Sequence, residues 1–144
     1  MNRFHRAAAL GALAALLSTG FAQSALAADI HTKPPANFKK VSTLVKLPDY
    51  LPGLGTLYVD PSTLPAGPFL GYDKKGKLVE VTYMLPLKDL DAHKNFEDMG
   101  AKLGNLKVNH TDITYNPGHP GVEEPHYHIT QWLITKKQQD ADLK

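Results

Sequence analysis

Apolar and polar positions alternate in the middle of the chain and predict a sheet. In the segment 77–85, apolar residues recur at 79, 81, 83 and 85, which would place them on one face of a strand. A second β-type run, Phe69–Tyr72, precedes it, and Asp73–Gly76 separates the two with turn-forming residues that end in glycine. This pattern predicts a β-hairpin with Asp73–Gly76 as its turn.

The rest of the pattern adds further strands and one helix. Four other segments are rich in β-branched and aromatic residues and are predicted as strands: Val41–Leu47, Thr56–Val59, Leu106–Tyr115 and His126–Thr135. Leu87–Leu103 instead carries apolar residues at spacings of three and four, which predicts a helix. We therefore expect a mainly β (α+β) fold, an antiparallel β-sandwich or barrel with one helix near residues 87–103.

The N-terminal segment has the pattern of a signal peptide. Arg3 and Arg6 precede an apolar run, Ala7–Leu17, that is too short to span a bilayer as a helix, and Ala25–Ala27 fits the small-x-small cleavage rule. The pattern predicts a signal peptide over residues 1–27 and a periplasmic or secreted protein. The remaining chain divides into an extended N-terminal arm (28–40), a single β-rich domain (41–135) and a charged, frayed C-terminal tail (136–144).

Charge and cysteine content narrow the function classes. Removal of Arg3 and Arg6 with the signal peptide would leave 14 basic and 14 acidic residues, so the mature chain shows no basic excess for nucleic acid. No later segment predicts a membrane span, so we expect no membrane partner after cleavage. The chain has no cysteine, which excludes disulfides and thiolate metal sites.

The segment Tyr115–Trp132 holds three of the seven histidines and is the strongest candidate for chemistry. His126 and His128 are two residues apart in a predicted strand, so both side chains would point to the same face. The preceding loop, rich in glycine and proline, could bring His119 and Glu124 over that face. The sequence thus predicts that His119, His126 and His128 bind one divalent metal.

The fourth ligand and the metal stay open at the sequence level. Either Glu124 or His110 could complete the site, because antiparallel pairing of strands 106–115 and 126–135 would place His110 near the other histidines. Asp112, on the same face, could orient a ligating imidazole. Imidazole and carboxylate ligands suit zinc, our first choice, and also copper(II), nickel and iron(II). The alternative is an ordinary polar strand face.

Three parts of the chain resemble a family of exported, functionally uncharacterised bacterial β-domains. These are Leu54-Gly55-Thr56-Leu57-Tyr58, Asp73-Lys74-Lys75-Gly76-Lys77, and Asn116-Pro117-Gly118-His119 followed by Pro125-His126-Tyr127-His128. The resemblance covers roughly Leu54–Ile134, and only the closing motif is specific. It implies that His119 and His126 are ligands in a metal-binding domain that can form homo-oligomers.

The chain departs from that family pattern at two motif positions. His128 stands where the family has aspartate, Thr130 stands where it has its last histidine, and the Gly-His loop is about one residue shorter. The resemblance therefore implies a changed or shifted ligand set. Pro125-His126-Tyr127-His128 also resembles the first half of a cupin motif, but the downstream glutamate is missing and Gln131 is a poor substitute.

Three functions compete on these grounds. The first is a non-enzymatic exported metal-binding protein with a histidine-rich divalent site. The second is a cupin-like metalloenzyme that acts on a small molecule and needs an open coordination position. The third is a structural, oligomer-forming β-domain without metal.

Overall fold

The computed structural model describes residues 29–101 and 103–144, so the predicted signal peptide lies outside the described residues. The mainly β prediction is confirmed, since six strands carry the fold and the two α-helices are short. The strands are β1 (Lys39–Lys40), β2 (Thr56–Val59), β3 (Phe69–Tyr72), β4 (Leu78–Pro86), β5 (His110–Asn116) and β6 (His126–Trp132). The helices are η1 (Val41–Thr43), η2 (Pro61–Thr63), α1 (Leu87–Asp91) and α2 (Lys136–Asp142).

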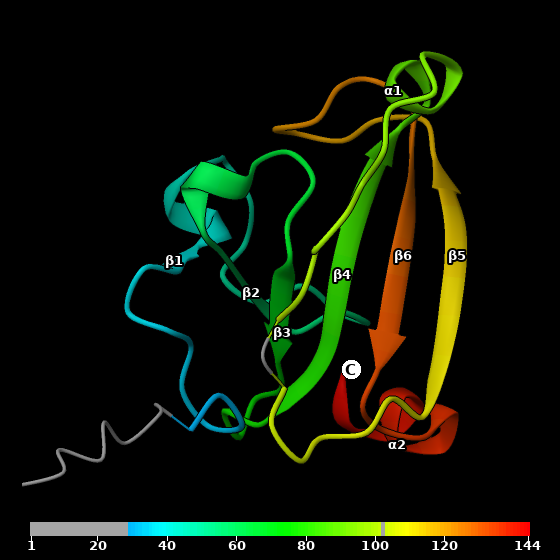
Figure 1. Cartoon of the computed structure of the whole chain (residues 1–144). Helices are drawn as coiled ribbons and strands as arrows, with labels where there is room; N and C mark the ends of the chain where they lie inside the picture. Colours follow the sequence, from blue (N-terminus) through cyan, green and yellow to red (C-terminus); the bar gives the residue numbers. More distant parts are fainter. Residues whose placement is uncertain (1–28, 102) are drawn as a thin grey trace, which may run out of the picture.

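The six strands form one antiparallel sheet in the order β1-β2-β3-β4-β6-β5. Figure 1 shows β4, β6 and β5 side by side as three long strands, with β1 and β2 turned away from them. Helix α1 lies at one end of the long strands and α2 at the other. None of the helices in the described ranges is long and apolar enough to cross a membrane.

The predicted hairpin is confirmed. β3 pairs with β4, and Tyr72 lies opposite Leu78. The Asp73 carboxylate accepts hydrogen bonds from the backbone N–H groups of Lys75 (2.8 Å) and Lys77 (2.9 Å). Gly76 has φ +78°, a conformation that glycine adopts without steric cost. The turn chemistry was therefore readable from the sequence.

β4 is buried on both faces, although the sequence pattern indicated a single apolar face at 79, 81, 83 and 85. Glu80, Thr82 and Met84, on the opposite face, are at most 6% exposed. β4 lies in the interior of the sheet between β3 and β6, and loops cover the face that carries these residues. The alternation predicted the strand correctly but did not predict that its second face is buried as well.

The predicted helix over 87–103 is too long, because α1 ends at Asp91. His93 has φ +56° and Asp98 has φ +53°, and such left-handed residues interrupt a right-handed helix. The segments 92–101 and 103–109 instead run back along the sheet without regular structure (Figure 1). Leu103 and Leu106 pack against the core cluster around Leu70 and Val81. The apolar spacing thus reflected packing of an irregular segment rather than a helix.

The C-terminal segment is a helix rather than the predicted frayed tail. Thr135 accepts a hydrogen bond from the Gln138 N–H, and the Gln138 side chain accepts one from the Thr135 N–H, which together form a capping box. Leu143, 1% exposed, packs with Val79 and Trp132. The capping box was present in the sequence as Thr-x-x-Gln and would have predicted this helix.

The N-terminal region also differs from expectation. The arm expected to be extended and free is docked, because Ile30 and Phe38 pack against the core and the Tyr72 hydroxyl donates to the Ile30 carbonyl at 2.9 Å. The predicted strand Val41–Leu47 is instead η1 followed by turns. Its apolar residues line a cavity described below, so their burial does not require a strand.

Candidate metal centre

β6 supplies two of the predicted ligands from one face, as the period-two pattern indicated. His126 is fully buried and His128 half-buried, and both pair across to β4, with His126 opposite Pro86 and His128 opposite Met84. Figure 1 places this part of β6 at the α1 end of the sheet. The interior position of β6 between β4 and β5 fixes the backbone from which both imidazoles project.

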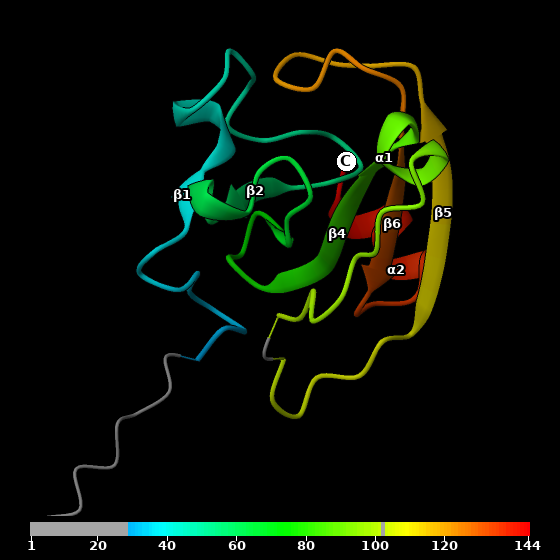
Figure 2. The ribbon, with the colours of Figure 1, turned by 45° about the horizontal axis from the view of Figure 1, so that its top comes forward.

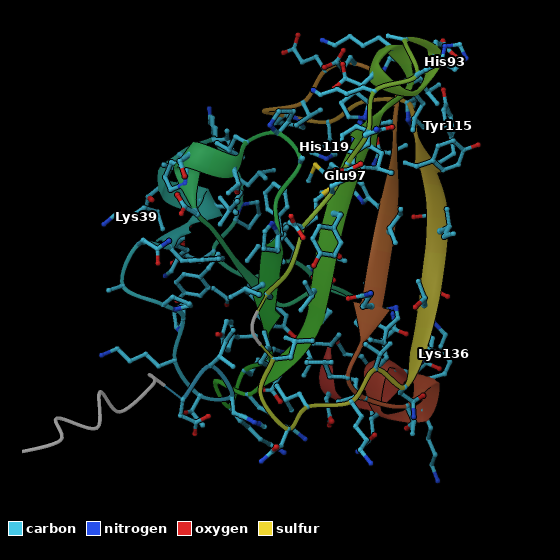
Figure 3. All side chains as sticks on the ribbon, in the orientation of Figure 1. Lys39, His93, Glu97, Tyr115, His119 and Lys136 are labelled. Atoms are coloured by element: carbon cyan, nitrogen blue, oxygen red, sulfur yellow. The ribbon has the colours of Figure 1, made fainter. Side chains whose placement is uncertain are left out.

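The loop 117–125 brings the third histidine to the same place. The Asn116 side chain accepts a hydrogen bond from the Gly118 N–H at 2.8 Å, and His119 exchanges two backbone hydrogen bonds of 2.9 Å with Val122 around Pro120-Gly121. Proline followed by glycine at a positive φ, here +92°, is the signature of a type II turn. Figure 3 shows His119 at the α1 end of the sheet, away from Lys136 of α2.

Two glycines are required for this loop. A Cβ on Gly118 would lie 2.5 Å from the Glu123 carbonyl oxygen, and one on Gly121 would lie 2.8 Å from a methyl carbon of Val45. Both also have positive φ. The loop can therefore fold tightly over β6 and against the 41–47 segment only with glycine at these positions.

The three imidazoles, which we call the triad, converge through their Nε2 atoms. These atoms are separated by 2.9 Å (His126–His128), 3.2 Å (His126–His119) and 3.3 Å (His119–His128). An ion bonded at about 2.0–2.1 Å to each nitrogen would have nitrogen–nitrogen edges of about 3.3 Å if tetrahedral and about 2.9 Å if octahedral. The triad therefore has the spacing of a facial three-nitrogen metal site, and it can hold a metal ion.

Backbone carbonyls orient two of the rings and fix their protons. His126 Nδ1 lies 2.7 Å from the Glu124 carbonyl oxygen, and His119 Nδ1 lies 3.1 Å from the Pro120 carbonyl oxygen. A carbonyl only accepts hydrogen bonds, so each Nδ1 carries a proton and donates it. In the neutral rings the two Nε2 atoms then present lone pairs toward each other, as metal-ligating histidines do.

The third ring is held neutral by its surroundings. Burial, followed by the neighbouring His126 and His119, lowers the pKa of His128 from 6.5 to about 4. Protonation of His128 is therefore an unfavourable way to relieve the repulsion between the Nε2 lone pairs of the triad at neutral pH. A divalent cation would relieve their mutual repulsion without that cost.

Glu124 takes part in the centre through its backbone rather than its carboxylate. Its side chain forms an ion pair of 2.7 Å with Lys88 of α1 and raises the pKa of that lysine. Within the described residues, the group of convergent ligand atoms consists of the three histidines. The structure thus brings His119, His126 and His128 together and directs the Glu124 carboxylate to a partner on α1.

His110 lies away from the triad, so the predicted proximity is wrong. The β5–β6 register starts with Asn116 opposite His126, which places His110 opposite Trp132, six residues along the strand. That offset is about 20 Å at 3.4 Å per residue. His110 stacks on Trp132 with ring centroids 6.1 Å apart, and Asp112 accepts a hydrogen bond of 2.9 Å from the Trp132 indole. The pairing was predicted correctly, but the long loop set a register that separates these residues.

A buried polar chain on the same face of the sheet escaped the sequence analysis. Glu80 is fully buried, its carboxylate accepts a hydrogen bond from the Thr82 hydroxyl, and Thr82 is 2.8 Å from the Thr130 hydroxyl. Burial raises the pKa of Glu80 to about 7. In the sequence, Glu80 alternates with apolar residues, which is the pattern of a solvent-exposed strand residue. Its burial follows only from the loops that cover this face of the sheet.

The triad also borders a cavity. His119 and His128 line an apolar cavity of about 340 Å³ together with residues from the 41–65 segment and from β3 and β4. Because no carboxylate of the described residues joins the ligand group, a metal ion held by three imidazoles would keep a coordination position free.

Comparisons with known proteins find a similar solved structure. No family model matches the chain, and no curated protein matches it. Among solved structures, it resembles the hypothetical protein TTHB210 from Thermus thermophilus at 50% sequence identity and a TM-score of 0.61. The match covers 67% of this chain and 87% of that protein.

Proposed function

We propose that this chain, which belongs to the same family as that Thermus protein, is an exported metal-binding protein whose triad holds one divalent ion. The observation that carries the proposal is the convergence of three Nε2 atoms within 3.3 Å of one another, two of them on rings whose Nδ1 lies within hydrogen-bonding distance of a backbone carbonyl. Such second contacts orient ligating histidines in metal proteins.

Zinc is the metal we expect first. Three imidazoles without thiolate or carboxylate suit zinc, and they also accept copper(II), nickel and iron(II), so ligand type alone leaves these metals in competition. Copper(II) binds such sites more tightly than zinc by intrinsic affinity. The metal present in the cell then depends on supply in the compartment as well as on the site.

The test is calorimetric titration of the chelator-stripped protein with zinc, copper(II) and nickel. Wild type should bind one ion, and the double change His126→Ala with His128→Ala should abolish binding. His110→Ala is the matched control, because it removes an imidazole from the same sheet face outside the triad and should leave one ion bound. Equal binding by wild type and the double variant would overturn the proposal.

A second candidate, a metalloenzyme acting on a small molecule, rests on the cavity. Catalytic zinc sites combine three protein ligands with a free position in a pocket, and the triad borders such a pocket. Cobalt(II) substitution tests the free position, because added azide should change the visible spectrum if an exogenous ligand can bind. Turnover of activated esters at a rate lost with His126→Ala would support the enzyme, and an azide-insensitive spectrum would remove this candidate.

Export and self-association complete the proposal. Periplasmic or secreted location is supported by the signal-peptide pattern of residues 1–27. A homo-oligomer is supported by β5, an edge strand on which Ile113 and Tyr115 are 66% and 55% exposed. Sedimentation of the purified protein measures the oligomeric state, and a monomer at all concentrations would contradict this part.

A further inference from the structure

The cavity beside the triad has an almost entirely apolar lining. Apart from His119, His128 and Asn116, every residue that lines it is apolar. Two lining leucines, Leu44 and Leu64, are 42% and 46% exposed, so the apolar lining continues to the surface. Figure 2 shows the loop 117–125 and the 41–55 segment on the same side of the sheet. Residues of both segments line the cavity.

We infer that this cavity binds a small amphipathic molecule with an aliphatic tail and a carboxylate head. The tail occupies the apolar cavity, and the head binds the metal ion at the coordination position that the triad leaves free. This inference rests on the proposed metal binding, and it adds a ligand class to that site.

Charge favours an anionic head. Three neutral imidazoles leave the full positive charge of a divalent ion uncompensated, and the nearby Glu124 carboxylate is paired with Lys88. A charge next to an apolar, poorly hydrated wall is costly unless it is paired. A carboxylate supplies both the missing negative charge and a ligand oxygen that divalent zinc accepts.

The volume sets the size of the tail. An engineered apolar cavity of about 150 Å³ holds benzene, so about 340 Å³ accommodates roughly ten carbons once the head is included. This volume is near the lower end of ordinary small-molecule pockets. A medium-chain carboxylate such as decanoate therefore matches the cavity in both length and polarity, whereas acetate fills little of it.

The experiment compares three probes on the purified protein. Zinc binding is measured first by calorimetry, and then decanoate, decanol and acetate are titrated into the zinc-loaded protein below the micelle concentration. Decanoate should bind at least tenfold more tightly than either decanol, which lacks the charge, or acetate, which lacks the tail. On the zinc-free protein, the preference for decanoate over decanol should disappear.

A pair of variants locates the site. Leu64→Glu places a negative charge at the mouth of the cavity on a half-exposed residue, and it should weaken decanoate binding at least tenfold while zinc binding stays unchanged. Leu90→Glu is the matched control, because Leu90 on α1 is similarly exposed (37%) and does not line the cavity. It should leave both affinities unchanged.

The outcomes separate the two proposals. Failure of the wild-type protein to bind zinc would overturn the proposed function itself. Normal zinc binding with decanoate no tighter than acetate or decanol would overturn the ligand inference alone, as would an effect of Leu90→Glu equal to that of Leu64→Glu. If decanoate fails to bind and Leu64→Glu instead dissociates an oligomer, a second copy of the chain covers the cavity and the inference is also wrong.

Discussion

The Nε2 atoms of His126 and His128 lie 2.9 Å apart, although the two residues are at positions i and i+2 of the same strand, β6. Strand geometry separates the backbones of such residues by roughly 6–7 Å, so the rings must lean toward each other. His119 closes the group from a loop that approaches the same face. The metal site is therefore assembled from one strand and one turn, and its integrity depends on both.

Metal binding should stabilise the fold. A ligand that binds only the native state at a hundredfold excess over its dissociation constant adds about 2.7 kcal/mol to the free energy of unfolding. Denaturant unfolding of the chelator-stripped protein with and without zinc measures this gain. The double variant at His126 and His128 should show none, and a zinc effect of the same size in that variant would contradict binding at the triad.

The metal-free protein should lose stability in acid through His128. The pKa of His128 is about 4 in the folded protein, below the 6.5 of the free side chain, so the unfolded state takes up a proton first as the pH falls. The stability that His128 contributes relative to His128→Asn should be present above pH 6.5 and decline toward pH 4. Unfolding of both proteins across this range measures it, and a constant difference would contradict the shift.

Glu80 should have the opposite effect on stability. Its pKa is about 7 in the folded protein against 4.5 for the free side chain, so the folded state retains the proton between these values and stability declines as the pH rises through them. Glu80→Gln removes this loss. We expect the variant to gain up to about 3 kcal/mol relative to wild type between pH 4 and pH 8, from 1.36 kcal/mol per pKa unit.

The control for this prediction is Glu97→Gln, since Glu97 is exposed. It should track wild type across the pH range. A pH-independent difference between wild type and Glu80→Gln, measured by urea unfolding, would show that Glu80 titrates normally.

Leu143 should anchor the C-terminal helix. It is 1% exposed and packs with Val79, Trp132 and Ile134, so Leu143→Ala should cost about 2–5 kcal/mol, the range for truncating a buried leucine. Lys144→Ala, next to it and exposed, should change stability by less than about 0.5 kcal/mol. Equal midpoints of thermal unfolding for Leu143→Ala and wild type would contradict the packing role of α2.

Export should remove residues 1–27. The basic residues Arg3 and Arg6, the apolar run Ala7–Leu17 and the Ala25-Leu26-Ala27 site predict cleavage after Ala27. Intact-mass measurement of protein recovered from the periplasm should give a chain that begins at Ala28. A mass that includes Met1 in the exported fraction would refute the cleavage.

The sequence by itself determined the local features of this protein. The β3–β4 hairpin follows from strand alternation around Asp73–Gly76, and the common face of His126 and His128 follows from the two-residue repeat of a strand. Both features depend on residues that are close together in the sequence, so local interactions were sufficient to predict them. The capping box of α2 belongs to the same class, although its signal at Thr135 and Gln138 was overlooked.

Only the tertiary structure decided which distant residues meet. The position of His110 depends on the β5–β6 register, which the loop 117–125 sets, and no local pattern encodes that register. The burial of Glu80 and the enclosed cavity depend on loops that fold back over the sheet. Long-range contacts arise from the collective packing of many residues, so the ligands His126 and His128 could be predicted from spacing, whereas the free coordination position and its apolar surroundings could not.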